Sequence, residues 1–213
     1  MKWFLSVFIW FYILSKHYIF AIEQCPRDMV FIPKGIFMMG EVNNLKKIFT
    51  ESFCVDQREI TQIKYKLEMG KNPSYFKGDR NPVETVSWFQ ADKYCKKLDK
   101  RLPSEIEWEK SARAGSLTKY YWGNKMNIFY LWYSINSEYK THPVGEKKPN
   151  QYGLYDILGN VYEWTTSWDS DEKKFKVIRG GSWANRENSV RTAYRDRAGP
   201  FEKGSDVGFR CVQ

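Results

Sequence analysis

Two segments carry hydrophobic residues at helical spacing, and each begins with the same polar signal. Ser87 with Gln90, and Ser104 with Glu107, have the spacing of a capping box. After Ser87, apolar residues recur every three or four positions and predict one buried helix face: Trp88, Ala91, Tyr94, Cys95 and Leu98. The second helix is expected to end near Gly115, where a C-terminal cap belongs.

The remaining elements are predicted to be short. Residues 29–39 are apolar but interrupted by a proline and a glycine, which suggests a bent hairpin. Residues 48–55 favour a further strand, and Thr61 is placed to cap a short helix that ends at Gly70. From Tyr120 onward, aromatic residues alternate with turn residues and no period persists. The pattern therefore predicts an α+β domain with little regular secondary structure and long loops.

The first residues look like a targeting segment rather than part of this domain. Residues 1–21 contain no Asp or Glu, and Lys2 precedes an apolar run over residues 3–14. This predicts a signal peptide, or an uncleaved anchor if the weak cleavage site is not used. Residues 22–213 would then form one domain, secreted or periplasmic, with a membrane partner only if the leader is retained.

Composition narrows the class of function. The chain has 213 residues, of which 42% are hydrophobic and 17% aromatic, so it is not a disordered chain. Its net charge of +9 is scattered in short runs. We therefore expect a solvated basic surface and no nucleic-acid partner.

Cysteine and histidine counts limit the chemistry further. An exported chain with four cysteines most simply forms two disulfides, for which three pairings exist. We favour Cys25 with Cys54 and Cys95 with Cys211, since the second bond would hold the chain end. Without the leader only His142 remains, which excludes histidine-rich zinc and two-histidine iron sites within one chain.

Nine short stretches, taken in order, resemble the sulfatase-modifying-factor family, whose best-known members are formylglycine-generating enzymes. They are MVFIPKGIFMMG (29–40), FCVDQREIT (53–61), NPVETVSW (81–88), RLPSEIEWE (101–109), WGN (122–124), YGLYD (152–156), GNVYEW (159–164), RGGSW (179–183) and GFRC (208–211). The resemblance implies a C-type-lectin-like fold held by disulfides, and it supports the bond between Cys95 and Cys211.

The resemblance also implies a calcium site. An oxygen-rich turn of this kind suits a hard cation. The family's site corresponds here to side-chain oxygens of Asp156 and Glu163 and to carbonyl oxygens of Gly159 and Val161.

The family's oxidative chemistry is not expected in this chain. Oxidising members have two cysteines, five residues apart, that bind copper(I) soon after the Gly-Gly-Ser motif. Ser182 is present here, but the two positions hold Asn185 and Val190, which do not bind copper(I) as thiolates do. The site is degenerate, and no copper is expected.

Three functions follow from this combination. The first is a monomeric binding module for a peptide, a protein or a small molecule. Its groove would follow the Gly-Gly-Ser strand and include Trp183, Asn185, Arg186, Glu187, Asn188, Arg191, Tyr194 and Arg195. A structural role is the alternative for the arginines at 179, 191, 195 and 210. The second function is an enzyme with altered oxidative or metabolite-maturation chemistry. The third is an inactive paralogue that binds a maturation enzyme or its substrate.

Overall fold

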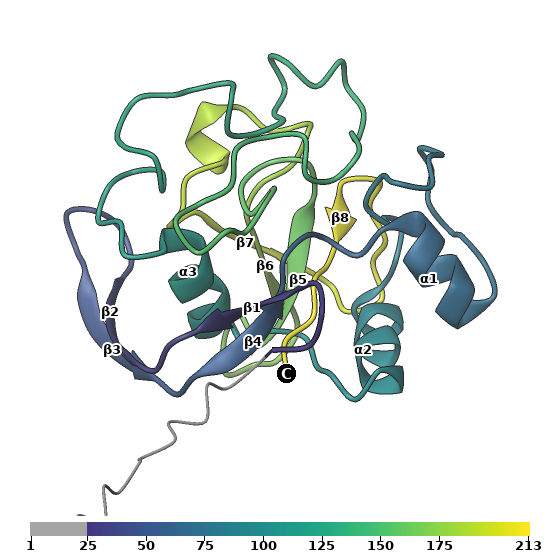
Figure 1. The fold of residues 1–213 in the computed structure, drawn as a ribbon, viewed down its shortest axis with the longest axis horizontal. Helices are drawn as coiled ribbons and strands as arrows, with labels where there is room; N and C mark the ends of the chain where they lie inside the picture. The colour runs from purple at the N-terminus through teal and green to yellow at the C-terminus, as the bar shows by residue number, and fades with distance from the viewer. Residues whose placement is uncertain (1–24) are drawn as a thin grey trace, which may run out of the picture.

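A computed structural model describes residues 25–213 (Figure 1). The predicted leader, residues 1–21, lies outside the described residues. The elements are β1 (Met29–Ile32), β2 (Gly35–Met39), β3 (Lys46–Thr50), β4 (Phe53–Asp56), α1 (Gln62–Met69), α2 (Trp88–Lys97), α3 (Glu105–Arg113), β5 (Tyr162–Trp168), β6 (Lys176–Arg179), the 3-10 turn η1 (Glu187–Ser189), β7 (Arg195–Ala198) and β8 (Val207–Gly208). Short elements and long loops confirm the α+β expectation.

The first four strands form two small antiparallel sheets. β1 pairs with β4, and β2 pairs with β3. The expected hairpin within residues 29–39 is therefore wrong, because Pro33 bends a strand whose partner is residues 46–56. The expected strand 48–55 is likewise divided between β3 and β4. A local apolar pattern shows where strands lie but not which distant segment pairs with them.

The predicted helices form, and their N-terminal caps are confirmed. The capping side chains belong to Thr61, Ser87 and Ser104, the last two within complete capping boxes. At the end of α3, the left-handed cap is Ala114, with φ of 46°, rather than Gly115. Gly115 follows with φ of 88°, so the prediction was one residue late.

The second half of the chain builds a four-stranded sheet in the order β7-β6-β5-β8. β8 is parallel to β5, and the other pairs are antiparallel. The main core lies between this sheet and α2, where Tyr94, Trp164 and Phe209 are buried. In Figure 1, β2 and β3 lie on one side of the sheet and α1 and α2 on the other.

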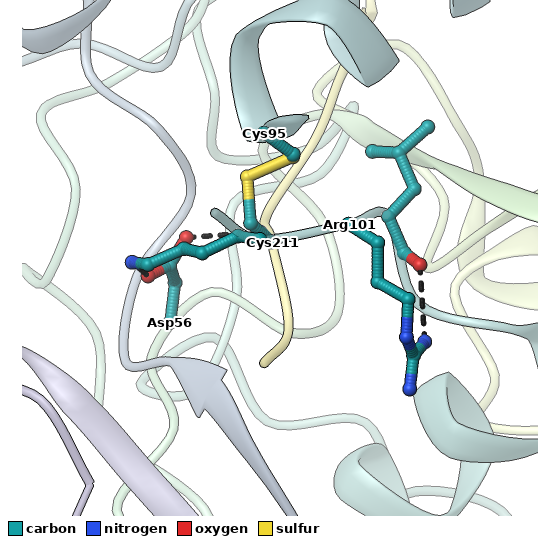
Figure 2. Close-up of a disulfide and its surroundings, with 6 residues drawn as sticks. Asp56, Cys95, Arg101 and Cys211 are labelled. Atoms are coloured by element: carbon teal, nitrogen blue, oxygen red, sulfur yellow. Dashed lines mark hydrogen bonds and ion pairs between the residues drawn. A yellow bond between two sulfur atoms is a disulfide. The ribbon is translucent and has the colours of Figure 1, made fainter. Parts of the chain in front are cut away.

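Both favoured disulfides are present. Cys25 is bonded to Cys54, and Cys95 of α2 is bonded to Cys211 near the chain end. Figure 2 shows the second bond beside Asp56, whose Oδ2 accepts the backbone N–H of Cys211 at 2.9 Å. The C-terminal residues are therefore fixed by a covalent bond and by backbone hydrogen bonds to β4. Over residues 25–213, the structure contains no helix with the length and hydrophobicity needed to span a bilayer.

Candidate binding site

The Gly-Gly-Ser motif folds the chain back immediately after β6. Gly180 and Gly181 have φ of 98° and 75°, a region that favours glycine. A Cβ on Gly181 would lie 2.5 Å from the carbonyl oxygen of Ser189, so a side chain does not fit there. The two glycines thus allow the 182–194 segment to pack closely against the end of the sheet.

Ser182 and Asn185 close a tight turn with each other. The Ser182 hydroxyl and backbone N–H both donate to Asn185 Oδ1, at 2.7 and 2.8 Å. The Asn185 N–H in turn donates to the Ser182 carbonyl at 3.1 Å. Because Ser182 is fully buried and these polar groups bond to each other, their contacts serve the local fold.

Val190 lies in a different environment from Asn185. Its side chain is fully buried and packs in the core cluster that contains Trp108, Tyr120 and Leu158. The two positions that the resemblance predicts to correspond to the copper cysteines are therefore a turn residue and a core residue. All four cysteines of the chain are in disulfides, so the chain offers no free thiolate.

The residues of the expected groove do not share one neighbourhood. Trp183 packs edge-on against Phe76, with ring centroids 5.3 Å apart, and its Nε1 donates to the Ser205 carbonyl. Glu187 lies elsewhere, paired with Lys119 at 3.0 Å, a hydrogen bond that lowers the pKa of the Glu187 carboxyl. Arg186 and Asn188 are exposed.

The remaining groove residues extend away from this loop. Arg191 pairs with Glu41 in the turn after β2, and Tyr194 packs against the main core. Arg195, on β7, pairs with Glu105 at 2.8 Å and also with Asp169. The structure thus spreads the eight residues over several neighbourhoods. Within the loop 183–188, the side chains of Arg186, Glu187 and Asn188 face solvent.

The four arginines for which we considered both a binding and a structural role differ in how deeply they are buried. Arg179 is 1% exposed and pairs with Glu109, while its Nη1 and Nη2 also donate to the carbonyls of residues 192–194. Arg210 is fully buried and pairs with Glu163 at 2.8 Å. These two are structural, whereas the arginines at 191 and 195 make partly exposed ion pairs.

Sequence reasoning missed the neighbours of Trp183, because they come from distant loops. A hollow of about 520 Å³ lies beside Phe76 and includes His142. His142 stacks on Trp132 with centroids 3.7 Å apart, and its Nε2 lies 2.7 Å from the Ser137 carbonyl. No motif linked the two segments that line the hollow, residues 76–81 and 138–146, since they are far apart in the sequence.

The predicted calcium turn has one free carboxylate oxygen. Asp156 is buried, and its Oδ2 accepts the Gly145 N–H at 2.6 Å, whereas Oδ1 has no hydrogen-bond partner. Burial raises the pKa of Asp156 to about 6, with a further contribution from the nearby charge of Glu163. An orphaned buried oxygen of this kind fits a hard cation.

Glu163 fits a calcium site less well. Both of its oxygens accept from Arg210, and Oε2 also accepts the Trp108 indole N–H at 2.8 Å. Among residues 25–213, no group of three or more His, Cys, Asp or Glu side chains is arranged to hold a metal ion. A calcium site at this turn would therefore depend on Asp156 and on backbone carbonyls.

The profile of the sulfatase-modifying factor enzyme 1-like domain matches residues 20–213. The chain therefore belongs to this family, which confirms the resemblance found in the motifs.

Two relatives show how varied the family is. Chaperone protein LppX of Paenibacillus barcinonensis is 28% identical over 249 residues, covering 87% of this chain and 89% of that protein. Inactive C-alpha-formylglycine-generating enzyme 2 of Bos taurus is 38% identical over 149 residues, covering 62% of this chain. The match spans 50% of the bovine protein's length.

Solved structures confirm the fold. Treponema denticola variable protein 1 superposes with a TM-score of 0.80 at 28% identity, over 86% of this chain and 94% of that one. The U1 variant of Major Tropism Determinant gives a TM-score of 0.51 at 14% identity, over 75% of this chain and 50% of that one. The second match shows only the C-type-lectin-like fold.

Proposed function

We propose that this protein is an exported, non-oxidising member of the family that binds a protein through the loop 183–188. The observation that carries the proposal is that Asn185 and Val190, the positions predicted to correspond to the copper cysteines, lie in different environments. Asn185 closes a turn with Ser182, and Val190 is enclosed in the core. Copper(I) prefers soft thiolate ligands, and every cysteine of the chain is in a disulfide.

Binding is supported by the exposed chemistry of the loop. Arg186, Glu187 and Asn188 present charged and amide groups to solvent, and Trp183, in the same loop, packs its ring against Phe76. Arginine and tryptophan are the residues most often found as anchors of interfaces. A relative named as a chaperone and another named as inactive support a non-catalytic role. The two disulfides support export to an oxidising compartment.

Site-specific photocrosslinking tests the binding surface. A benzoylphenylalanine residue replaces Arg186 in one variant and Lys66, an exposed residue of α1, in a matched control. We expect the variant at 186 to form a discrete adduct in the exported fraction, suppressed by excess unlabelled protein, while the variant at 66 forms none. Equal adducts at both positions, or none at either, would contradict the proposal.

A second assay tests the loss of oxidation. The purified protein, copper(I) and oxygen are incubated with a Cys-x-Pro-x-Arg peptide, with an active formylglycine-generating enzyme as positive control. Mass spectrometry should show the peptide unchanged. Conversion of its cysteine to formylglycine would overturn the non-oxidising assignment and favour the enzymatic alternative.

Calcium at the 156–163 turn is a separate proposal, supported by the unpartnered Asp156 Oδ1. EDTA should lower the melting temperature of the wild-type protein, and added calcium should restore it. Asp156→Asn should remove most of this response. A wild-type melting temperature that EDTA does not change would eliminate the site.

A further inference from the structure

A cavity of about 330 Å³ lies between β2 and the end of α3, away from the loop 183–188. α3 contacts both β2 and β3, and Figure 1 shows the three elements side by side. The lining residues are Pro33, Lys34, Gly35, Ile36, Phe37, Met38, Lys110, Arg113, Gly115, Ser116, Leu117 and Tyr152. The lining combines apolar and cationic side chains and includes no carboxylate.

Lys110 places an uncompensated charge against this cavity. The residue is 4% exposed, and its ammonium donates to the Pro33 and Gly35 carbonyls and to the Thr50 hydroxyl. In the described part of the chain it has no carboxylate within ion-pair distance. Burial lowers the pKa of Lys110. Fully buried lysines are rare unless an acidic group pairs with them.

Two further cations strengthen the positive potential. Arg113 lines the cavity, and it shares its carboxylate partner Glu109 with Arg179, which also lies 3.8 Å from Glu105. Lys34 is exposed at the cavity and makes no ion pair with another described residue. An anion in the cavity would be attracted by all of these charges, with the strongest effect in the low-dielectric interior.

The other walls are apolar. Ile36 and Leu117 are 68% and 52% exposed, which leaves large hydrophobic side chains in contact with water. Tyr152 adds an aromatic wall, and its hydroxyl makes no hydrogen bond to another described residue. The cavity therefore offers free donors on Lys34 and Tyr152 beside an apolar surface. Its volume is at the small end of the range for ligand pockets.

We propose that this cavity binds the carboxylate of a medium-chain fatty acid. The carboxylate would accept hydrogen bonds from Lys34 and Tyr152 in the positive field of Lys110 and Arg113. The alkyl chain would cover Ile36 and Leu117 and remove them from water. This site is independent of the proposed binding surface at 183–188.

Titration calorimetry with three eight-carbon probes tests the proposal: octanoate and octylammonium below their micellar concentrations, and octanol below its solubility limit. We expect octanoate to bind at least tenfold more tightly than octanol, and octylammonium to bind weakest. Octanol binding as tightly as octanoate would indicate an apolar groove without anion recognition. Failure of octanoate to bind would also overturn the proposal.

Exposed substitutions locate the site without disturbing the fold. Leu117→Asp and Lys34→Glu should each weaken octanoate binding about tenfold. Leu67→Asp and Lys71→Glu are the matched controls, since both residues are exposed and neither lines the cavity. If the controls weaken binding as much as the cavity variants, the assigned location is wrong. Lys110 is left unchanged because its hydrogen bonds join β2 and β3 to α3.

Discussion

Two glutamates, Glu109 of α3 and Glu187 of the 182–194 segment, make similar ion pairs in different surroundings. Glu109 is 1% exposed and bonds Arg113, Arg179 and the Gly40 N–H. Glu187 pairs with Lys119 at 3.0 Å, with half of its own side chain exposed. Removing water strengthens charge interactions and raises the cost of leaving one partner alone. The same type of ion pair, between a glutamate and a basic side chain, thus stabilises the interior at Glu109 and lies exposed on the surface at Glu187.

The largest effect is expected from Glu109→Gln. This substitution removes the carboxylate that both buried arginines share and leaves Arg179 only the Glu105 carboxylate at 3.8 Å, so we expect a loss of about 3–5 kcal/mol in the free energy of unfolding. Urea denaturation followed by tryptophan fluorescence measures it. A loss below about 1 kcal/mol would mean that water reaches the interior pair as freely as the surface pair.

Asn185→Ala tests whether the turn is structural. The variant leaves the Ser182 N–H and hydroxyl without the acceptor that they share. An unsatisfied buried polar group costs about 1–3 kcal/mol, and the unfolding midpoint should fall accordingly. Asn188→Ala, in the same loop but exposed, serves as control. Equal stability of the two variants would show that the 182–185 bonds do not hold the loop.

Lys176 is an intermediate case, because it is buried between aromatic rings rather than beside a carboxylate. Its Nζ lies 3.6 Å from the Trp168 ring centroid and 4.3 Å from that of Trp88. Burial lowers the pKa of Lys176 to about 8, below the value of about 10.4 for a free lysine.

Between these two pKa values the unfolded chain binds more protons at this residue, so its contribution to stability rises with pH. We expect the stability of wild-type protein relative to Lys176→Met to increase from about pH 8 to about pH 10.5. The denaturation midpoints of both proteins across this pH range measure the difference in their stability. The contributions of other titrating groups are common to both proteins and cancel in this difference. A constant difference would show that Lys176 keeps an ordinary pKa.

The smallest effect is expected from Glu187→Gln. An exposed ion pair contributes about 0–1 kcal/mol, so the unfolding free energy should change by less than about 1 kcal/mol. The same denaturation experiment compares it directly with Glu109→Gln. A cost similar to that of the buried variant would place Glu187 in a structural role and remove it from the proposed binding surface.

The sequence predicted features that depend on near neighbours. Ser87 and Ser104 cap their helices because a capping box needs only residues three positions apart. The bond between Cys25 and Cys54 was likewise favoured by closeness in sequence. The strand partners of residues 29–39 were missed, because pairing depends on segments that the apolar pattern does not connect. The residues of the expected groove also do not lie together, because consecutive residues of an irregular loop contact different neighbours.

By itself, the sequence determined the helix starts, the α+β class, the family and the absence of a free cysteine pair in this chain. Only the tertiary structure decided that Val190 is a core residue, that Arg179 and Arg210 are interior ion-pair partners, and that Lys110 lies buried without a carboxylate. The physical reason is that residue identity and local spacing fix caps and motifs. Burial and charge pairing arise only when distant segments exclude water together.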